Sequence, residues 1–171
     1  MRKDSYKVMV RAALLLALTL LFQWSRFLLP VPPVFSTLVT GTLVNACLAI
    51  AVELVGLSPT AVISIIAPVV AYTQGMLPLP VFIIPIALAN FLYIVVLRTG
   101  IHWNRLLAIG TAAIVKSAVL YLVFAWLLTL ININPKVAAG VLFIMSWPQL
   151  FTAIAGGSIA LVVVKRIKYL I

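Results

Sequence analysis

Charged side chains are scarce in this chain, and acidic ones are nearly absent. Only 8% of its 171 residues are charged, and two of these are acidic, Asp4 and Glu53. Soluble domains carry roughly 25% charged residues. This chain has too few polar side chains to cover a water-facing surface, so we expect lipid to cover most of it. The sequence therefore predicts an integral membrane protein with no soluble domain.

The chain also lacks the residue types that most catalytic and metal sites need. It has one cysteine, Cys47, and one histidine, His102. A single cysteine allows neither a disulfide nor a cysteine metal site within one chain. We find no phosphate-binding loop, paired acidic metal motif, histidine cluster or nucleophile with its base. We therefore expect no enzyme activity, no ATP hydrolysis, no metal and no cofactor.

Basic residues outnumber acidic ones twelve to two, which gives a net charge of +10. Such a charge could indicate a nucleic-acid-binding protein. However, the basic residues lie at the ends of hydrophobic segments, which is typical of cytoplasmic loops in membrane proteins. The expected partner is therefore the lipid bilayer and not nucleic acid.

Hydrophobic residues fill most of the remaining sequence, at 65% of the chain. A spanning helix takes roughly 20 residues, so six spans with short loops nearly exhaust the length. Prolines and glycines separate the segments, because proline lacks an amide donor and restricts its predecessor. We predict an all-α, single-domain compact bundle over residues 1–171. Its six transmembrane helices are expected at about 7–29, 35–55, 60–74, 81–97, 106–131 and 139–164.

Three of these segments have features of their own. The first is not a convincing signal peptide, because it is long and no small-residue cleavage site follows it. The third is short and contains Pro68, which predicts a kink or a half-buried helix. The sixth is expected to be interrupted or tightened at Trp147-Pro148.

The basic residues also predict an orientation in the membrane. Nine of them fall on one side of the six predicted spans, and only Arg26 and Lys136 fall on the other. Loops rich in lysine and arginine stay in the cytoplasm, so both termini should be cytoplasmic. An even number of spans agrees with this. The nine are Arg2, Lys3, Lys7, Arg11, Arg98, Arg105, Lys165, Arg166 and Lys168.

Lys116 and Glu53 are ionisable residues inside predicted spans, and polar groups at membrane depth are costly, so each needs a reason. Lys116 is about ten residues into the fifth segment, or roughly 15 Å from its inner end at helical rise. It could bind an anionic ligand group or pass a proton, or it could tie the bundle internally to a carboxylate or carbonyls. Glu53 lies near the inner end of the second segment, and we expect it to face water or a partner.

Polar amides form two further groups of candidates. Asn90 lies at mid-depth in the fourth segment with Tyr93 on the same face, and Asn45 is similarly deep in the second. Asparagine at this depth often bonds a neighbouring helix, and Asn90 is the stronger candidate for ligand contact. Near the outer face, aromatic residues alternate with glutamines and could form a pocket or an interfacial belt. This outer group comprises Gln23, Trp24, Tyr72, Gln74, Trp147 and Gln149.

Small residues spaced by four mark surfaces where helices can approach closely. Ala13 and Ala17 have this spacing in the first segment. They could pack within the chain or against another membrane protein, and the residues alone do not decide between these.

Several of these stretches resemble the substrate-binding S components of energy-coupling factor (ECF) vitamin transporters. The basic amino terminus running into Arg11-Ala-Ala13-Leu-Leu-Leu-Ala17 is similar to their first helix, with its alanine-x-x-x-alanine motif. The stretches 38–45, Leu-Val-Thr-Gly-Thr-Leu-Val-Asn, and 147–153, Trp-Pro-Gln-Leu-Phe-Thr-Ala, look similar to S components of unassigned substrate. The resemblance covers the whole chain in topology, although small-x-x-x-small motifs are common in membranes.

The resemblance implies a function, a set of partners and a location. The chain would be a substrate-binding subunit that captures a vitamin or related micronutrient from outside a prokaryotic plasma membrane. Ala13 and Ala17 would dock on a transmembrane coupling component, and two ABC ATPases would supply energy. Pro30–Pro33 would be a lid over a pocket formed by Gln23, Tyr72, Gln74, Asn90, Lys116, Trp147 and Gln149.

Two other functions remain open from the sequence. A structural membrane scaffold resembling the rod-shape factor MreD is also small, apolar and about six-spanning, but it would need no buried lysine. A stand-alone proton-coupled carrier would use Lys116 and Glu53 and would need no ATPase partner. No vitamin-specific residue set matches, so the ligand stays open, although Lys116 would suit a carboxylate or phosphate.

Overall fold

The computed structural model describes residues 2–28, 32–131 and 133–170, and within these ranges all regular structure is helical. A single 3-10 turn precedes the fourth α-helix. In chain order the elements are α1 Arg2–Leu28, α2 Pro33–Leu54, α3 Leu57–Thr73, η1 Pro80–Phe82, α4 Ile83–Gly100, α5 Arg105–Leu130, α6 Pro135–Ile144 and α7 Trp147–Leu170. Half of the Pro30–Pro33 stretch, expected to form a lid, lies outside the described residues, namely Pro30 and Val31.

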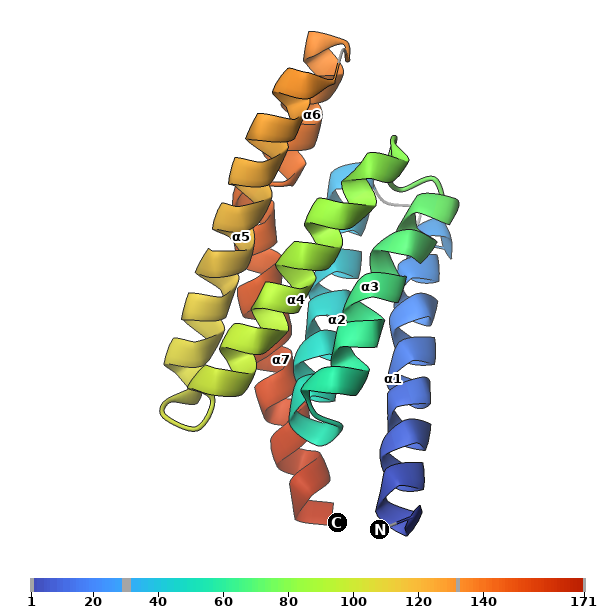
Figure 1. Cartoon of the computed structure of the whole chain (residues 1–171), viewed down its shortest axis with the longest axis vertical. Coiled ribbons are helices and arrows are strands. Elements are labelled where there is room, and N and C mark those ends of the chain that lie inside the picture. The colour runs from blue at the N-terminus through green and yellow to red at the C-terminus, as the bar shows by residue number, and fades with distance from the viewer. Residues whose placement is uncertain (1, 29–31, 132, 171) are drawn as a thin grey trace.

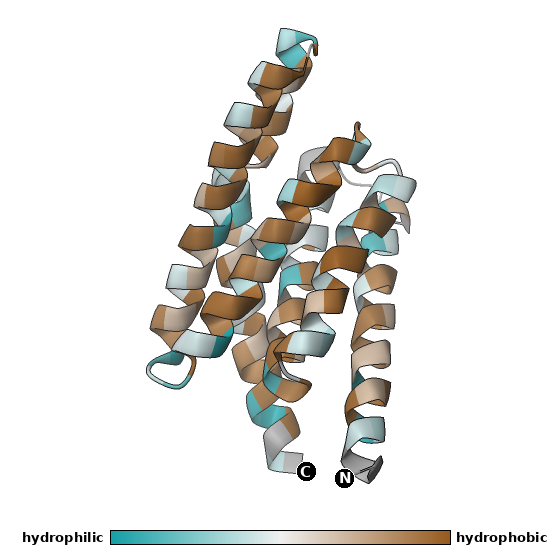
Figure 2. Ribbon diagram, in the orientation of Figure 1, coloured by the Kyte–Doolittle hydropathy of each residue, from teal (hydrophilic) through white to brown (hydrophobic). Residues whose placement is uncertain are grey.

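Five stretches are long and apolar enough to cross a membrane: Ser5–Phe27, Phe35–Leu54, Pro80–Gly100, Arg105–Leu130 and Pro135–Ile167. The last of these runs through both α6 and α7. Helix α3 is equally apolar but shorter, with 17 residues. Large apolar side chains lie exposed along the helices, and Figure 2 shows hydrophobic residues over most of their length. The prediction of an all-α, multi-pass membrane protein is therefore confirmed.

The helices pack side by side, with both chain ends at the same end of the bundle (Figure 1). At the opposite end, the hairpin of α5 and α6 extends beyond the other helices. Exposed basic residues, including Lys7, Arg98 and Lys165, lie on elements that reach the end with the termini. Arg26 and Lys136 lie towards the opposite end.

The predicted helix 139–164 is two helices in the structure, and Pro148 explains the break. An uninterrupted helix would place an N–H at position 148 against the carbonyl of Ile144, but proline has no N–H. Helix α6 accordingly ends at Ile144 and α7 begins at Trp147. The helix also starts earlier than predicted, because the Asn134 side chain accepts from the backbone N–H of Lys136 at 2.9 Å and caps α6.

The closest helix packing joins α2 to α7, where small residues remove the side chains that would hold the backbones apart. A Cβ atom on Gly156 would lie 2.6 Å from the carbonyl oxygen of Thr42 and 2.7 Å from the Asn45 Cβ. Such a contact is too short for any side chain. Gly156 therefore fixes how closely α7 approaches α2, and it does so beside Asn45.

Two apolar clusters fill the interior, and a polar layer separates them. The cluster towards the termini includes Leu48, Tyr93 and Ala113, and the cluster towards the other end includes Ala89 and Leu120. Three deep polar residues fall between these positions along their helices: Asn45 on α2, Asn90 on α4 and Lys116 on α5. The candidate site is built on this layer.

Candidate functional site

A buried ammonium group stands at the centre of the polar layer. Lys116 is 4% exposed, and its Nζ donates to the Asn45 Oδ1 at 2.5 Å and to the Asn90 Oδ1 at 2.7 Å. The same Nζ lies 5.3 Å from the centre of the Tyr93 ring. These contacts join α2, α4 and α5 around one cation. Amide oxygens and a ring face stabilise an ammonium, but they carry no compensating negative charge.

Contacts with α7 hold the residues around Lys116 in place. The Asn45 Nδ2 donates to the Thr152 Oγ1 at 3.3 Å, which leaves the amide oxygen directed at Lys116. The Tyr93 hydroxyl donates to the carbonyl of Ala153 at 3.0 Å. Helix α7 therefore orients two of the groups that surround the ammonium without touching it.

Glu53, the acidic residue whose side chain is described, does not lie beside Lys116. Glu53 lies on α2 towards the end with the termini, and its Oε2 is 3.7 Å from a guanidinium nitrogen of Arg105. The Glu53 side chain is 8% exposed and the Arg105 side chain 42%. Glu53 thus pairs with a basic residue of its own chain rather than with Lys116.

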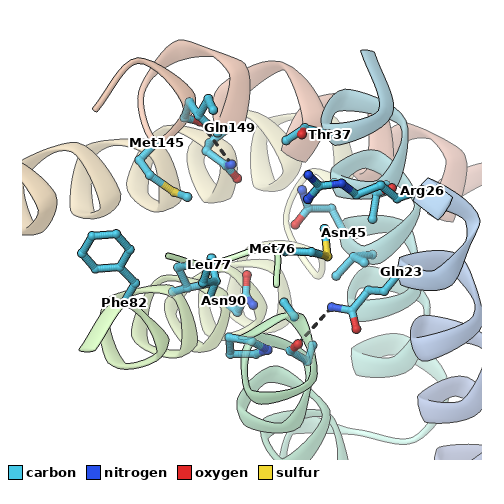
Figure 3. Close-up of a pocket in the computed structure, with 18 of the residues that line it drawn as sticks. Gln23, Arg26, Thr37, Asn45, Met76, Leu77, Phe82, Asn90, Met145 and Gln149 are labelled. Carbon is cyan, nitrogen blue, oxygen red and sulfur yellow. Dashed lines mark hydrogen bonds between the residues drawn. The ribbon is translucent and has the colours of Figure 1, made fainter. Parts of the chain in front are cut away.

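A cavity of about 280 Å³ opens over the polar layer. This is close to the lower end of the range for small-molecule pockets, roughly 300–1,000 Å³. Every α-helix contributes to its wall, and so does the chain between α3 and α4. In Figure 3, Gln23 and Arg26 lie on one side of the cavity, Met145 and Gln149 on another, and Leu77 and Phe82 on a third.

The wall is mostly apolar, with a few polar groups at separated points. Its polar members are Gln23, Arg26, Thr37, Thr40, Asn45, Asn90, Lys116 and Gln149. Apolar walls with a few oriented polar groups are typical of ligand-binding pockets. No carboxylate is among the described residues that line this cavity, so its charged groups are both cationic.

Two buried polar atoms on this wall lack a hydrogen-bond partner among the described residues. They are the Gln23 Oε1 and the Thr40 Oγ1. Gln23 is 4% exposed and Thr40 is 3% exposed. The Gln23 Nε2 donates to the carbonyl of Ala67 at 2.9 Å, which identifies the free end of that amide as oxygen. Both atoms are shielded from solvent and from the cavity, so each carries the cost of an unsatisfied buried polar group.

Gln149 has a structural task in addition to its place on the wall. Its Nε2 donates at 3.3 Å to the carbonyl of Ile144, the group that Pro148 leaves without an i+4 partner. The Ser117 hydroxyl, from α5, likewise donates to the carbonyl of Ser146 at 3.0 Å. Side chains thus satisfy the backbone at the α6–α7 break, as a break at membrane depth requires.

The structure places four of the seven predicted site residues on the cavity wall: Gln23, Asn90, Lys116 and Gln149. The other three do not line it. Trp147 is 57% exposed and packs edge-on against Phe143 at 5.7 Å between ring centres, and Tyr72 is 36% exposed. Gln74 has buried amide atoms, but they lie outside this cavity. These residues were predicted from their position along each helix, but the direction in which a helix face points decides what its side chains touch.

Sequence reasoning missed several wall residues and undervalued one. Asn45 is a direct partner of Lys116, and Arg26 and Thr40 line the cavity. A signal existed in α2, where Ser36, Thr37, Thr40, Thr42 and Asn45 interrupt the apolar segment. Thr37 and Thr40 are three residues apart and therefore share one face of the helix.

The unpaired hydroxyl of Thr40 makes a testable difference to stability. We expect Thr40→Val to raise the free energy of unfolding by about 1 kcal/mol, because it removes an unsatisfied buried group at constant shape. The matched control is Thr60→Val on α3, because the Thr60 hydroxyl is buried but donates to the carbonyl of Gly56 at 2.7 Å. Thermal unfolding in detergent should show opposite signs, and destabilisation of both variants would contradict the assignment.

No family model, no curated protein and no solved structure matches this chain. Among the described residues, no three histidine, cysteine, aspartate or glutamate side chains come together to hold a metal ion. The function is therefore inferred from the cavity and the buried ammonium beside it.

Proposed function

We propose that this chain is the membrane-embedded substrate-binding subunit of an ECF-type ABC importer. It captures a vitamin or related micronutrient from outside, and partner ATPases supply the energy. The observation that carries the proposal is a cavity lined by all the α-helices, with the Lys116 ammonium buried beside it. Polar groups at membrane depth are costly, and a cavity that concentrates them indicates a binding site.

The placement of the cavity supports capture from outside. It is lined by Arg26, by residues 76–78 between α3 and α4, and by the α6–α7 junction. These segments lie away from the end that holds the termini (Figure 1). In our proposal α3 makes a sixth crossing, both termini are cytoplasmic, and the basic residues near them follow the positive-inside rule.

The exposed face of α1 supports a docking role for this helix. Ala13 and Ala17 are both exposed, and only 11% of the most apolar part of α1 is buried inside the bundle. Helix α1 therefore offers a surface of small residues on which another membrane helix could pack closely. In our proposal this partner is the transmembrane coupling component, and two ABC ATPases bind to that component.

We expect Ala13→Trp to break assembly with the coupling component while sparing ligand binding. A tryptophan at this position would hold a partner helix away, but it points out of the bundle and is remote from the cavity. Co-purification of tagged protein with its partners measures assembly, and binding to the isolated protein measures capture. Exposed Leu14→Trp on the neighbouring face is the control. Unchanged transport by Ala13→Trp would remove the docking argument.

Two observations weigh against the alternatives. A scaffold of the MreD kind has no use for a buried ammonium beside a cavity, which costs stability unless it binds something. A carrier that moves protons between Lys116 and Glu53 would need the two groups in one site, but Glu53 pairs with Arg105 beyond the cavity wall. Uptake that persists in cells without any ATPase partner would nevertheless favour the carrier.

The decisive experiment is native mass spectrometry of gently purified protein. A retained small molecule together with coupling and ATPase subunits would support the proposal. Retained cell-wall machinery without a small molecule would favour the scaffold. Protein that retains nothing, and binds none of a vitamin panel after purification, would overturn the proposed function.

A further inference from the structure

The charges around the cavity bear on the kind of ligand that it takes. Lys116 and Arg26 are the charged side chains on the described wall, and both are positive. Lys116 is nearly fully buried, and its hydrogen-bond partners Asn45 and Asn90 are neutral amides. A buried charge without an opposite charge is strongly unfavourable, and a ligand anion at this point would supply it.

The number of N–H donors that remain on Lys116 limits which kind of anion can bind there. An ammonium group has three N–H donors, and the two asparagine oxygens take two of them. One donor therefore remains for a ligand oxygen. A carboxylate carries a single charge and fits one cation with one free donor, whereas a phosphate brings up to two charges and more acceptor oxygens. Arg26 is only half-buried near the mouth, where its charge would attract anions.

The rest of the wall is mostly apolar. Apolar side chains of Val44, Phe82 and Ile86 line it, which suits an apolar body. The Gln23 Oε1 and the Thr40 Oγ1 are shielded from the cavity, so they set no requirement on a ligand. The wall thus suits one molecule with an acid group and an apolar body.

We infer that the cavity selects a small, water-soluble organic monoanion whose carboxylate accepts a hydrogen bond from Lys116. This inference rests on the proposed function and adds the chemical class of the ligand. A fatty acid from the bilayer shares the carboxylate and the apolar body, so the experiments distinguish this source from a water-soluble acid.

Matched pairs of acid and neutral analogue test the charge requirement on the full chain in nanodiscs. The probes are nicotinate with nicotinamide, pantothenate with panthenol, lipoate with lipoamide, and biotin with biotin amide. Calorimetric titration should show that at least one acid binds and that its neutral partner binds at least about 30-fold more weakly. A neutral partner that binds as tightly as its acid would overturn the inference but leave the proposed function standing.

Asn90→Asp tests the same charge requirement by changing the protein instead of the ligand. The substitution keeps the shape of the side chain and places a carboxylate where the Asn90 Oδ1 now lies, 2.7 Å from the Lys116 Nζ. Because the ammonium then has an internal counter-charge, the preference for acid over neutral partner should fall from at least about 30-fold to near unity. A merely structural effect would weaken both analogues equally, and an unchanged preference would overturn the inference.

Identification of the retained ligand covers the case in which no probe binds. Native mass spectrometry with release of the bound molecule should find a small carboxylic acid. A retained neutral or cationic molecule would overturn the inference while sparing the proposed function. A retained fatty acid or phospholipid would show that the anion comes from the membrane, and it would also overturn the inference. Protein that retains no molecule and binds no probe would overturn both.

Discussion

Lys116→Met is expected to lower the affinity for the retained ligand by about 30- to 4,000-fold while the bundle stays folded. Removing one partner of a buried, hydrogen-bonded charge pair costs roughly 2–5 kcal/mol, much of it from the charge left alone. Methionine keeps most of the length and volume of lysine. Replacing a buried charge by an apolar group is often neutral or stabilising, so the empty protein should keep its stability.

Equilibrium titration with the ligand identified by mass spectrometry measures the affinity, and circular dichroism with size-exclusion chromatography measures folding. The control is Lys165→Met, because Lys165 is exposed near the end of α7 and remote from the cavity. Wild-type affinity in folded Lys116→Met would leave the ammonium with only an internal role, and the case for a ligand anion would fail.

Gly156→Ala is expected to lower the free energy of unfolding by about 1–3 kcal/mol and to weaken ligand binding at the same time. Overpacking a tight interior typically costs this much. The new Cβ would lie 2.6 Å from the Thr42 oxygen, 2.7 Å from the Asn45 Cβ and 2.8 Å from the Ala46 nitrogen, so α2 and α7 must shift relative to each other. Because Asn45 lies at this contact and its Oδ1 accepts from the Lys116 Nζ at 2.5 Å, such a shift would disturb that hydrogen bond.

Gly110→Ala on α5 is the matched control, because a Cβ there would meet nothing within 4 Å. Alanine is the better helix former by roughly 0.5–1 kcal/mol, so this variant should be slightly more stable than the native protein. Thermal unfolding in detergent reports the difference, which corresponds to roughly 2–4 °C per kcal/mol for a chain of this size. If both glycine variants gained stability, the close approach of α2 and α7 would be disproved.

Hydropathy and helix-breaking residues were enough to predict most of the helices. Gly56 and Gly75 adopt φ values of 87° and 70°, a region that strongly favours glycine, and each lies between two segments predicted as helices. The predicted helix 139–164 is the exception among the predicted helices. The interruption expected at Trp147-Pro148 divides it into α6 and α7. A missing N–H is a local property, so it can be read from the sequence. The Asn134 cap is local as well, and it marks a start of α6 that hydropathy alone put too late.

The partners of Lys116 could not be predicted in the same way. Its depth follows from its distance along α5, but its contacts depend on how α2, α4 and α5 are rotated about their axes. Apolar residues lie on all sides of each of these helices. The sequence therefore shows little of the amphipathic pattern that would predict which face of each helix points into the bundle. Asn45 was therefore undervalued, and Tyr72 and Trp147 were expected in the pocket but do not line the cavity.

The order in which the polar layer forms follows from its composition. Its members come from positions 45, 90 and 116, and Asn45 receives its orientation from Thr152. During synthesis the amino-terminal part of a chain emerges first, so both amides reach the bilayer before the ammonium does. Thr152, the residue that orients Asn45, is added last of these. A nascent chain halted before Thr152 would lack the hydrogen bond that directs the Asn45 oxygen at Lys116, so its ammonium would be less well held.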